Sequence, residues 1–151
     1  MTHVPHQGKD SRIKYLAFDP GLTVGWAAFD ESGKECAWGQ TPWDNVGKIL
    51  DTFGGNLIAV ICEDYVINPH VSHGGSKVET VRVIGMMQEY CRANNVPLVL
   101  QPPRIKKIGY AWAGRAPLPK SQHAQSHQFD ALAHGVYYLQ KNGIRKSVLD
   151  E

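Results

Sequence analysis

One short segment constrains the fold of this chain more than any other. Residues 16–26 run from an apolar stretch into Asp19-Pro-Gly21 and then into a second apolar stretch that contains Trp26. This pattern predicts a strand, a tight turn and a returning strand, with Asp19 at the end of the first strand. A carboxylate on a rigid strand beside small turn residues is well placed to bind a metal ion or a phosphate group. The same residues also suit an ordinary chain reversal, so this motif alone leaves both interpretations open.

The order of the predicted elements indicates an α/β fold built on a mixed five-stranded sheet. Apolar runs of strand length and apolar residues at helical spacing define these elements. The first three strands follow one another through short turns and should be antiparallel, whereas the last two follow helices and should run parallel to the first strand. The segment 108–122 shows no clear period and should form a short helix and a loop. The expected elements are strands at 13–18, 24–30, 34–39, 57–62 and 97–101, and helices at 46–53, 78–93 and 121–141.

The length of 151 residues fits one domain. Residues 13–143 are expected to form it, with a flexible tail at 1–12 and a short tail at 144–151. The three cysteines lack the spacing of a disulfide framework or a cysteine zinc site, which indicates a reducing cytoplasm. No apolar run approaches the roughly 18 residues of a membrane span, so no membrane association is expected. The net charge of +2 neither requires nor excludes nucleic acid as a partner.

Two further positions carry candidate cation ligands. Glu63 follows an apolar run and should lie at the carboxyl end of its strand. His127 and Asp130 are three residues apart on the last helix, so their Cβ atoms should lie about 5–6 Å apart on one face. Carboxylates and an imidazole gathered in one place would repel one another without a cation, and oxygen-rich ligands suit Mg²⁺ or Mn²⁺. Taken singly, His127 and Asp130 would more simply be exposed residues on the surface of a helix, and it is the three acidic positions together that favour a cation site.

The last helix also carries an apolar stripe opposite His127. We expect the small residues Ala131 and Ala133 to face the sheet and the stripe to meet another helix or a partner subunit. His123 and His127 have the spacing of two helical zinc ligands, but the glutamate of a zinc-binding H-E-x-x-H is missing, so zinc is the weaker interpretation. His134 is expected to pack or to form a hydrogen bond. The stripe consists of Phe129, Leu132, Val136 and Leu139.

Three motifs occur in order along the chain: strand-D-P-G-x-x-x-G-W, strand-Glu, and H-x-x-D-A-L-A on the last helix. Together they resemble the motifs of RuvC-type Holliday junction resolvases of the ribonuclease H-like superfamily, over residues 14–139. The resemblance implies a ribonuclease H-like fold and an endonuclease that resolves four-way DNA junctions with two divalent ions per active site, Mg²⁺ or Mn²⁺. Many relatives have a carboxylate where this chain has His127, which leaves the metal preference open. The implied catalytic and metal-binding residues are Asp19, Glu63, His127 and Asp130.

The resemblance also implies contacts with DNA. Lys120 resembles the family lysine beside the scissile phosphate, which makes it a catalytic and a DNA-binding candidate. Tyr65 is the aromatic residue nearest to the family's base-stacking position, although it is one residue out of register. Basic residues between the fifth strand and the last helix should meet phosphates, although a solvated surface would explain them too. These residues are Arg104, Lys106, Lys107, Arg115 and Lys120, with Lys77 and Arg82 as weaker candidates on the middle helix.

A four-way junction has two-fold symmetry, and cutting two opposed strands requires two active sites. Family analogy therefore implies a homodimer. On the middle helix, Val81, Ile84 and Cys91 can face the sheet, whereas other apolar residues fall partly on another side. The dimer interface is expected at Met86, Met87 and Tyr90, together with the Phe129 stripe.

Three other functions stay open. Asp19-Pro-Gly-Leu-Thr23 also looks like the phosphate loop of sugar kinases and actin-like ATPases, but those proteins need two lobes, so no nucleotide cofactor is expected. A ribonuclease H-like nuclease acting on RNA or on other branched DNA would use the same motif residues. A non-catalytic junction-binding module would bind the same DNA without cutting it.

Overall fold

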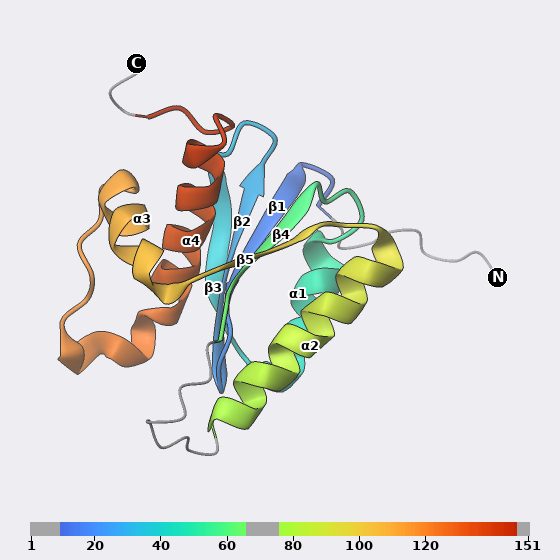
Figure 1. Ribbon diagram of the computed structural model, residues 1–151, viewed down its shortest axis with the longest axis horizontal. Coiled ribbons are helices and arrows are strands. Elements are labelled where there is room, and N and C mark those ends of the chain that lie inside the picture. Colours follow the sequence, from blue (N-terminus) through green and yellow to red (C-terminus); the bar gives the residue numbers. More distant parts are fainter. Residues whose placement is uncertain (1–9, 66–75, 148–151) are drawn as a thin grey trace.

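A mixed sheet forms the middle of three layers in the computed structural model, which describes residues 10–65 and 76–147 (Figure 1). The strand order is β3-β2-β1-β4-β5. β1 to β3 are antiparallel, whereas β4 and β5 run parallel to β1, so the predicted mixed sheet is confirmed. The strands are β1 (Ile13–Asp19), β2 (Thr23–Asp30), β3 (Glu35–Pro42), β4 (Ala59–Glu63) and β5 (Leu98–Gln101).

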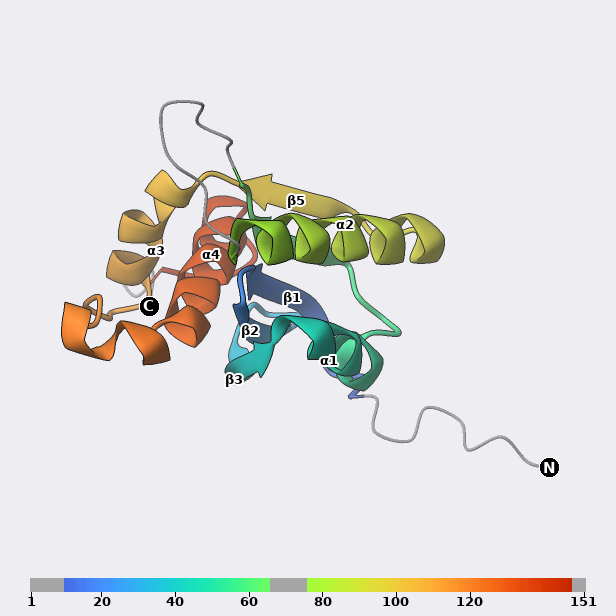
Figure 2. The ribbon, with the colours of Figure 1, turned by 90° about the horizontal axis from the view of Figure 1, so that it is seen from below.

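Helices lie on both faces of the sheet, and α3 packs mainly against α4. Figures 1 and 2 show α1 and α2 on one face and α3 and α4 on the other. The last helix begins at His127 rather than near Ser121, because residues 120–125 form the tighter 3₁₀ turn η3 instead. The helices are α1 (Val46–Phe53), α2 (Ser76–Asn94), α3 (Lys106–Trp112) and α4 (His127–Lys141), with 3₁₀ turns η1 (Trp43–Asn45), η2 (Pro103–Ile105) and η3 (Lys120–Gln125).

Alternation along the strands divides the core into two clusters. In β1, Leu16 and Phe18 pack with α1 and α2, whereas Tyr15 and Ala17 pack with α4. This period of two is the geometry of a strand whose two faces are both buried. β4 repeats the pattern, with Val60 and Cys62 in the first cluster and Ala59 and Ile61 in the second.

α4 is buried on two sides. A Cβ atom added to Gly135 would lie 2.3 Å from the Phe29 ring, which shows how closely the helix approaches the sheet. On its other side, a Cβ atom added to Gly109 of α3 would lie 2.1 Å from the carbonyl oxygen of Ala133. The expectation that the apolar stripe meets another helix or subunit is wrong for its buried members, because they share the sheet cluster with Ala131. These members are Leu132, Val136 and Leu139.

α2 also differs from its predicted orientation. Val81, expected to face the sheet, is 50% exposed, whereas Met87 is fully buried in the cluster shared with β1 and β4. Tyr90 is half-buried against the same cluster, so Met87 and Tyr90 serve this chain's own core rather than a partner surface. Met86 stays on the surface. The buried stripe consists of Val83, Ile84, Met87 and Cys91.

Parts of both expected tails, 1–12 and 144–151, contact the domain. The backbone N–H of Asp10 donates to the carbonyl of Thr52, and Arg145 donates to the carbonyl of Gly33 and pairs with Glu35. The rest of the two expected tails, residues 1–9 and 148–151, lies outside the described residues. Across the described part of the chain, no helix combines the length and the apolar character that crossing a membrane requires.

Candidate active site

Three neighbouring strands end in polar side chains that lie on the same face of the sheet. β1 ends at Asp19, β4 at Glu63 and β5 at Gln101, and the parallel register keeps these ends level. Successive side chains of a strand point to opposite faces. Because Ile61, two residues before Glu63, packs with α4, Glu63 faces α4 as well. The same alternation places Asp19 and Gln101 on that side.

α4 presents a polar stripe to these strand ends. His127, Asp130 and His134 are spaced by three and four residues, which places them along one side of the helix. His127 Nδ1 lies 3.2 Å from Asp19 Oδ2, and His134 Nε2 lies 3.0 Å from Glu63 Oε1. The expectation that His134 forms a hydrogen bond is therefore confirmed. A donor Nδ1–H on His127 leaves its Nε2 as the ring nitrogen with a free lone pair.

Gly25 allows α4 to come this close to the sheet. It lies directly opposite Asp19 in the β1–β2 register. A Cβ atom at this position would lie 1.8 Å from the carbonyl oxygen of His127. Because Gly25 has no side chain, the first turn of α4 rests on β2 and brings His127 beside Asp19.

Lys106, the first residue of α3, places a positive charge among the carboxylates. Its Nζ lies 3.0 Å from Glu63 Oε1 and 3.7 Å from Asp130 Oδ2. Burial alone would lower the pKa of Lys106, but the two carboxylates outweigh it and raise that pKa. The sequence predicts that Lys106 contacts DNA phosphates, whereas the structure engages its ammonium group with Glu63 and Asp130.

The electrostatics of the site show crowded negative charge. Burial and the negative charges of Glu63 and Asp130 raise the pKa of Asp19 to about 6. The hydrogen bond from His127 lowers this pKa but does not outweigh them. That hydrogen bond outweighs burial at His127 and raises the pKa of its imidazole. At Glu63, burial is outweighed by the hydrogen bond from His134 and the charge of Lys106, so its pKa lies below its ordinary value.

Tyr110 of α3 completes the surroundings of Asp130. Its hydroxyl donates a hydrogen bond of 2.5 Å to Asp130 Oδ1, and burial together with this bond raises the pKa of Tyr110. Sequence reasoning missed this residue. The available signal was the four-residue spacing from Lys106 to Tyr110, which places both side chains on one face of a helix.

The donor chemistry of the site fits a hard divalent cation. Asp19, Glu63 and Asp130 supply carboxylate oxygens, and His127 supplies an imidazole nitrogen, a set that suits Mg²⁺ or Mn²⁺. Within residues 10–65 and 76–147, no three His, Cys, Asp or Glu side chains are already arranged to hold a metal ion. The carboxylates of Glu63 and Asp130 instead contact the ammonium group of Lys106. An ion bound by these carboxylates would compete with Lys106 for the same oxygens.

Because Lys106 and a metal ion compete for the same carboxylates, we expect Lys106→Met to bind a divalent ion more tightly. Removing the ammonium group should tighten Mn²⁺ binding about tenfold in the absence of DNA, because one nearby positive charge opposing the ion is lost. Titration calorimetry measures this effect. Lys107→Met is the matched control, since Lys107 is exposed and neighbours Lys106 in α3. Equal Mn²⁺ affinity in Lys106→Met and wild type would contradict the competition.

A pocket of about 730 Å³ opens beside the carboxylates. α3 and η2 supply one wall, and the segment from Pro117 to the start of α4 supplies the other. His127 and Asp130 therefore border a space that also carries basic side chains. The lining includes three expected DNA contacts, Arg104, Lys106 and Lys107.

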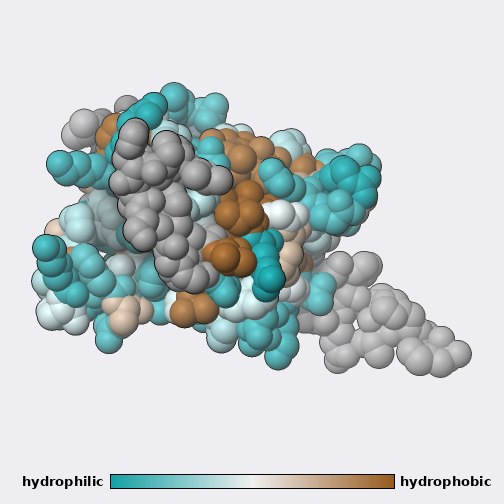
Figure 3. All heavy atoms as spheres, turned by 60° about the horizontal axis from the view of Figure 1, so that its bottom comes forward, coloured by the Kyte–Doolittle hydropathy of each residue, from teal (hydrophilic) through white to brown (hydrophobic). Residues whose placement is uncertain are grey.

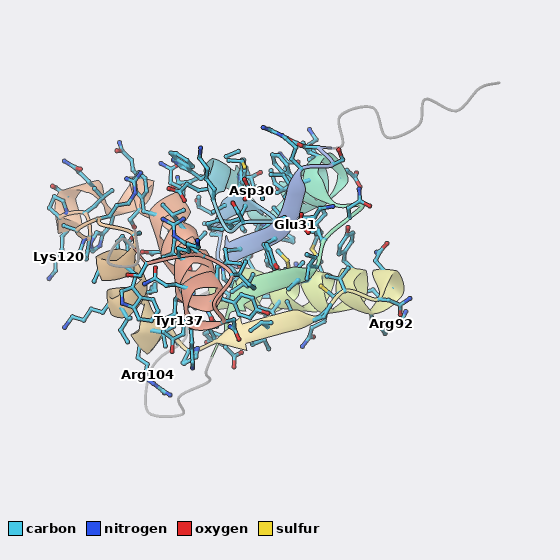
Figure 4. The ribbon with its side chains drawn as sticks, turned by 90° about the horizontal axis from the view of Figure 1, so that it is seen from above. Asp30, Glu31, Arg92, Arg104, Lys120 and Tyr137 are labelled. Carbon is cyan, nitrogen blue, oxygen red and sulfur yellow. The ribbon has the colours of Figure 1, made fainter. Side chains whose placement is uncertain are left out.

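The other expected DNA contacts lie outside this lining. Lys120 is exposed on η3, and Figure 4 shows it with Arg104 at the end of the molecule that carries α3. Arg115 packs over the Phe129 ring at 4.8 Å, whereas Arg82 packs over Trp43 at 5.7 Å, on the α2 side. Tyr65 packs against the cluster under α1 and α2 rather than standing free in the pocket, and the side chain of Lys77 lies outside the described residues.

The fold of this chain is similar to that of solved structures. No protein-family model and no curated protein matches the sequence. The structure of Thermus thermophilus RuvC in complex with a Holliday junction substrate matches with a TM-score of 0.59 and 16% identity, over 89% of this chain and 99% of that chain. A second Thermus thermophilus RuvC structure matches with a TM-score of 0.56 and 17% identity, over the same shares, 89% and 99%. The chain therefore has a RuvC-like, ribonuclease H-like fold, which confirms the predicted fold class.

Proposed function

We propose that this protein is a divalent-metal-dependent endonuclease that resolves four-way DNA junctions by paired, symmetric nicks. The observation that carries the proposal is the meeting of Asp19, Glu63, His127 and Asp130 beside a pocket with basic walls. The RuvC-like fold supports it, since one structure of that fold holds a Holliday junction substrate.

Each side chain of the site has a task in this proposal. Asp19, Glu63 and Asp130 would hold the divalent ions, and His127 would add a ligand through Nε2 because its Nδ1 donates to Asp19. Two bound Mg²⁺ or Mn²⁺ ions would supply an activated water and stabilise charge on the scissile phosphate. Tyr110 would keep Asp130 in one orientation through its hydroxyl. Lys120 is proposed to approach the phosphate being cut, where its charge would favour the transition state.

Basic residues around the pocket are proposed to bind the DNA backbone. Arg104→Ala combined with Lys107→Ala should weaken junction binding and reduce the slope of log affinity against log salt by about 2, one phosphate contact for each residue. Gel-shift titrations at several salt concentrations measure both quantities. Arg92→Ala is the control, because Figure 4 shows Arg92 at the far end of α2. An unchanged salt slope in the double variant would show that these two residues do not contact phosphates.

A homodimer is proposed because two opposed strands must be cut. The face of α1 and α2 presents hydrophobic surface (Figure 3), and α2 exposes Val78, Val81 and Met86 by 50%, 50% and 37%. Val81→Glu should therefore convert dimers to monomers, since a charge would be buried in the contact. Mass photometry of both proteins at micromolar concentration is the measurement. A monomeric wild-type protein would rule the dimer out.

Cleavage assays separate this function from its alternatives. The substrates are an immobile four-way junction, a flap, a linear duplex and an RNA–DNA hybrid, each with Mg²⁺ or Mn²⁺. The proposal expects the junction to be cut fastest, with nicks at symmetric positions. Faster cutting of the flap or of the hybrid would point to a different nuclease of the same fold, and tight junction binding without cutting would point to a binding module.

A further inference from the structure

A buried pair of polar side chains lies directly behind Glu63. Among the described residues, the buried polar side chains are Asp19, Gln101 and His134, and His134 has no exposed surface. Buried polar groups are costly unless they find hydrogen-bond partners. Gln101 and His134 are partners of each other, although they lie on different elements, β5 and α4.

The hydrogen bonds of Gln101 determine which way its amide points. Gln101 Nε2 lies 3.0 Å from the carbonyl oxygen of His134 and 3.0 Å from His134 Nδ1. A carbonyl oxygen only accepts hydrogen bonds, so the NH₂ group of Gln101 must face it. The second hydrogen of the same NH₂ group then points to Nδ1, which acts as the acceptor.

The acceptor role of Nδ1 fixes the tautomer of His134. A neutral imidazole carries one proton, so a bare Nδ1 places that proton on Nε2. Nε2–H then donates to Glu63 Oε1 over 3.0 Å. The opposite tautomer would turn a nitrogen lone pair towards the Glu63 carboxylate and would lose this bond.

We propose that Gln101 and His134 are positioning residues, which hold Glu63 in the orientation needed to bind a divalent cation. Gln101 sets the tautomer of His134, and His134 fixes the plane of the Glu63 carboxylate through Oε1. The inference rests on the proposed function, since it assigns Glu63 to a cation site. His134 lies one helical turn after Asp130 on α4. The helix therefore places the Asp130 carboxylate directly and the Glu63 carboxylate through His134.

The first test reads the tautomer without metal or DNA. Long-range proton–nitrogen NMR spectra of the wild-type protein in chelator, at pH 7.5 or above, distinguish a protonated Nε2 from a protonated Nδ1. The expected result is a His134 signal of the Nε2–H form. A signal of the Nδ1–H form would overturn the inference.

The second test measures Mn²⁺ binding by titration calorimetry in the absence of DNA. His134→Leu and Gln101→Met should weaken binding about 10–100-fold, the usual effect of losing a partner that orients a metal ligand. His134→Gln should stay within about threefold of wild type, because its amide can donate to Glu63 and accept from Gln101. Gln140→Leu, a polar-to-leucine change farther along α4, is the matched control and should bind Mn²⁺ like wild type. Thermal unfolding confirms that each variant is folded.

These results separate the inference from the proposed function. Wild-type affinity in His134→Leu, or equal loss in His134→Gln and His134→Leu, would overturn the positioning role even if the protein cuts junctions. Conversely, the expected tautomer and Mn²⁺ affinities in a protein that cuts no junction would support the positioning role and refute the proposed function.

Discussion

Asp19→Asn is expected to reduce junction cleavage about 10³-fold or more, because one carboxylate that would hold the ions is lost. Junction affinity should change little, since Asp19 is buried and is not among the residues that line the pocket with the basic side chains. Cleavage and gel-shift assays on one labelled four-way junction measure both properties. Loss of binding together with cleavage would mean that Asp19 serves the fold or the DNA contact instead.

The same substitution should stabilise the metal-free protein. Folding raises the pKa of Asp19 from 3.8 to about 6, so its ionised form is disfavoured in the folded state at neutral pH. Removing that charge should raise the free energy of unfolding by about 1–3 kcal/mol at pH 8. As pH falls from 8 towards 5, the folded wild type binds this proton while the unfolded chain stays ionised, so the difference should shrink by about half. It closes only below the unfolded pKa of 3.8. Thermal unfolding with chelator, at both pH values, measures this effect, and a less stable Asp19→Asn at pH 8 would contradict it.

Gly25→Ala should destabilise the protein by about 3 kcal/mol or more. The φ angle of Gly25 is not positive, so the cost comes from steric overlap rather than backbone strain. The new methyl group would overlap the carbonyl of His127, which is backbone and cannot rotate away. Relief of the overlap requires the first turn of α4 to leave β2, and cleavage should therefore fall as His127 leaves Asp19.

Gly47→Ala is the matched control for this substitution. Gly47 lies in α1, and a Cβ atom added there would meet no other atom within 4 Å. Alanine also favours a helix over glycine, so the variant should be as stable as wild type or more stable by up to about 1 kcal/mol. Urea unfolding of the two variants gives the comparison. Equal stability of Gly25→Ala and wild type would show that α4 does not rest on β2 as the structure places it.

Much of the fold follows from local signals in the sequence. The acidic ends of β1 and β4 were predictable because each apolar run stops at a carboxylate, and alternation alone assigns Asp19 and Glu63 to one face. The middle helix was harder to orient, since apolar residues surround it, and Val81 points outward where the pattern suggested the sheet. The start of α4 was misplaced because a 3₁₀ turn and an α-helix use similar residues.

The surroundings of the carboxylates depend on contacts between distant segments. Lys106 resembles its exposed neighbour Lys107 in the sequence, and only the packing of α3 against α4 turns one of them towards Glu63. Gln101 ends a strand of four residues, which is too short for its period to show a face. His134 gave the better signal, because it lies one turn beyond Asp130 on the same side of α4.

Anomalous scattering from crystals soaked in Mn²⁺ would test the central claim most directly. The account expects anomalous peaks among Asp19, Glu63 and Asp130, with the Lys106 ammonium group displaced from its present contacts. Crystals of Asp19→Asn soaked in the same way should show weaker peaks or none. Well-ordered wild-type crystals without a peak among these three carboxylates would contradict the account.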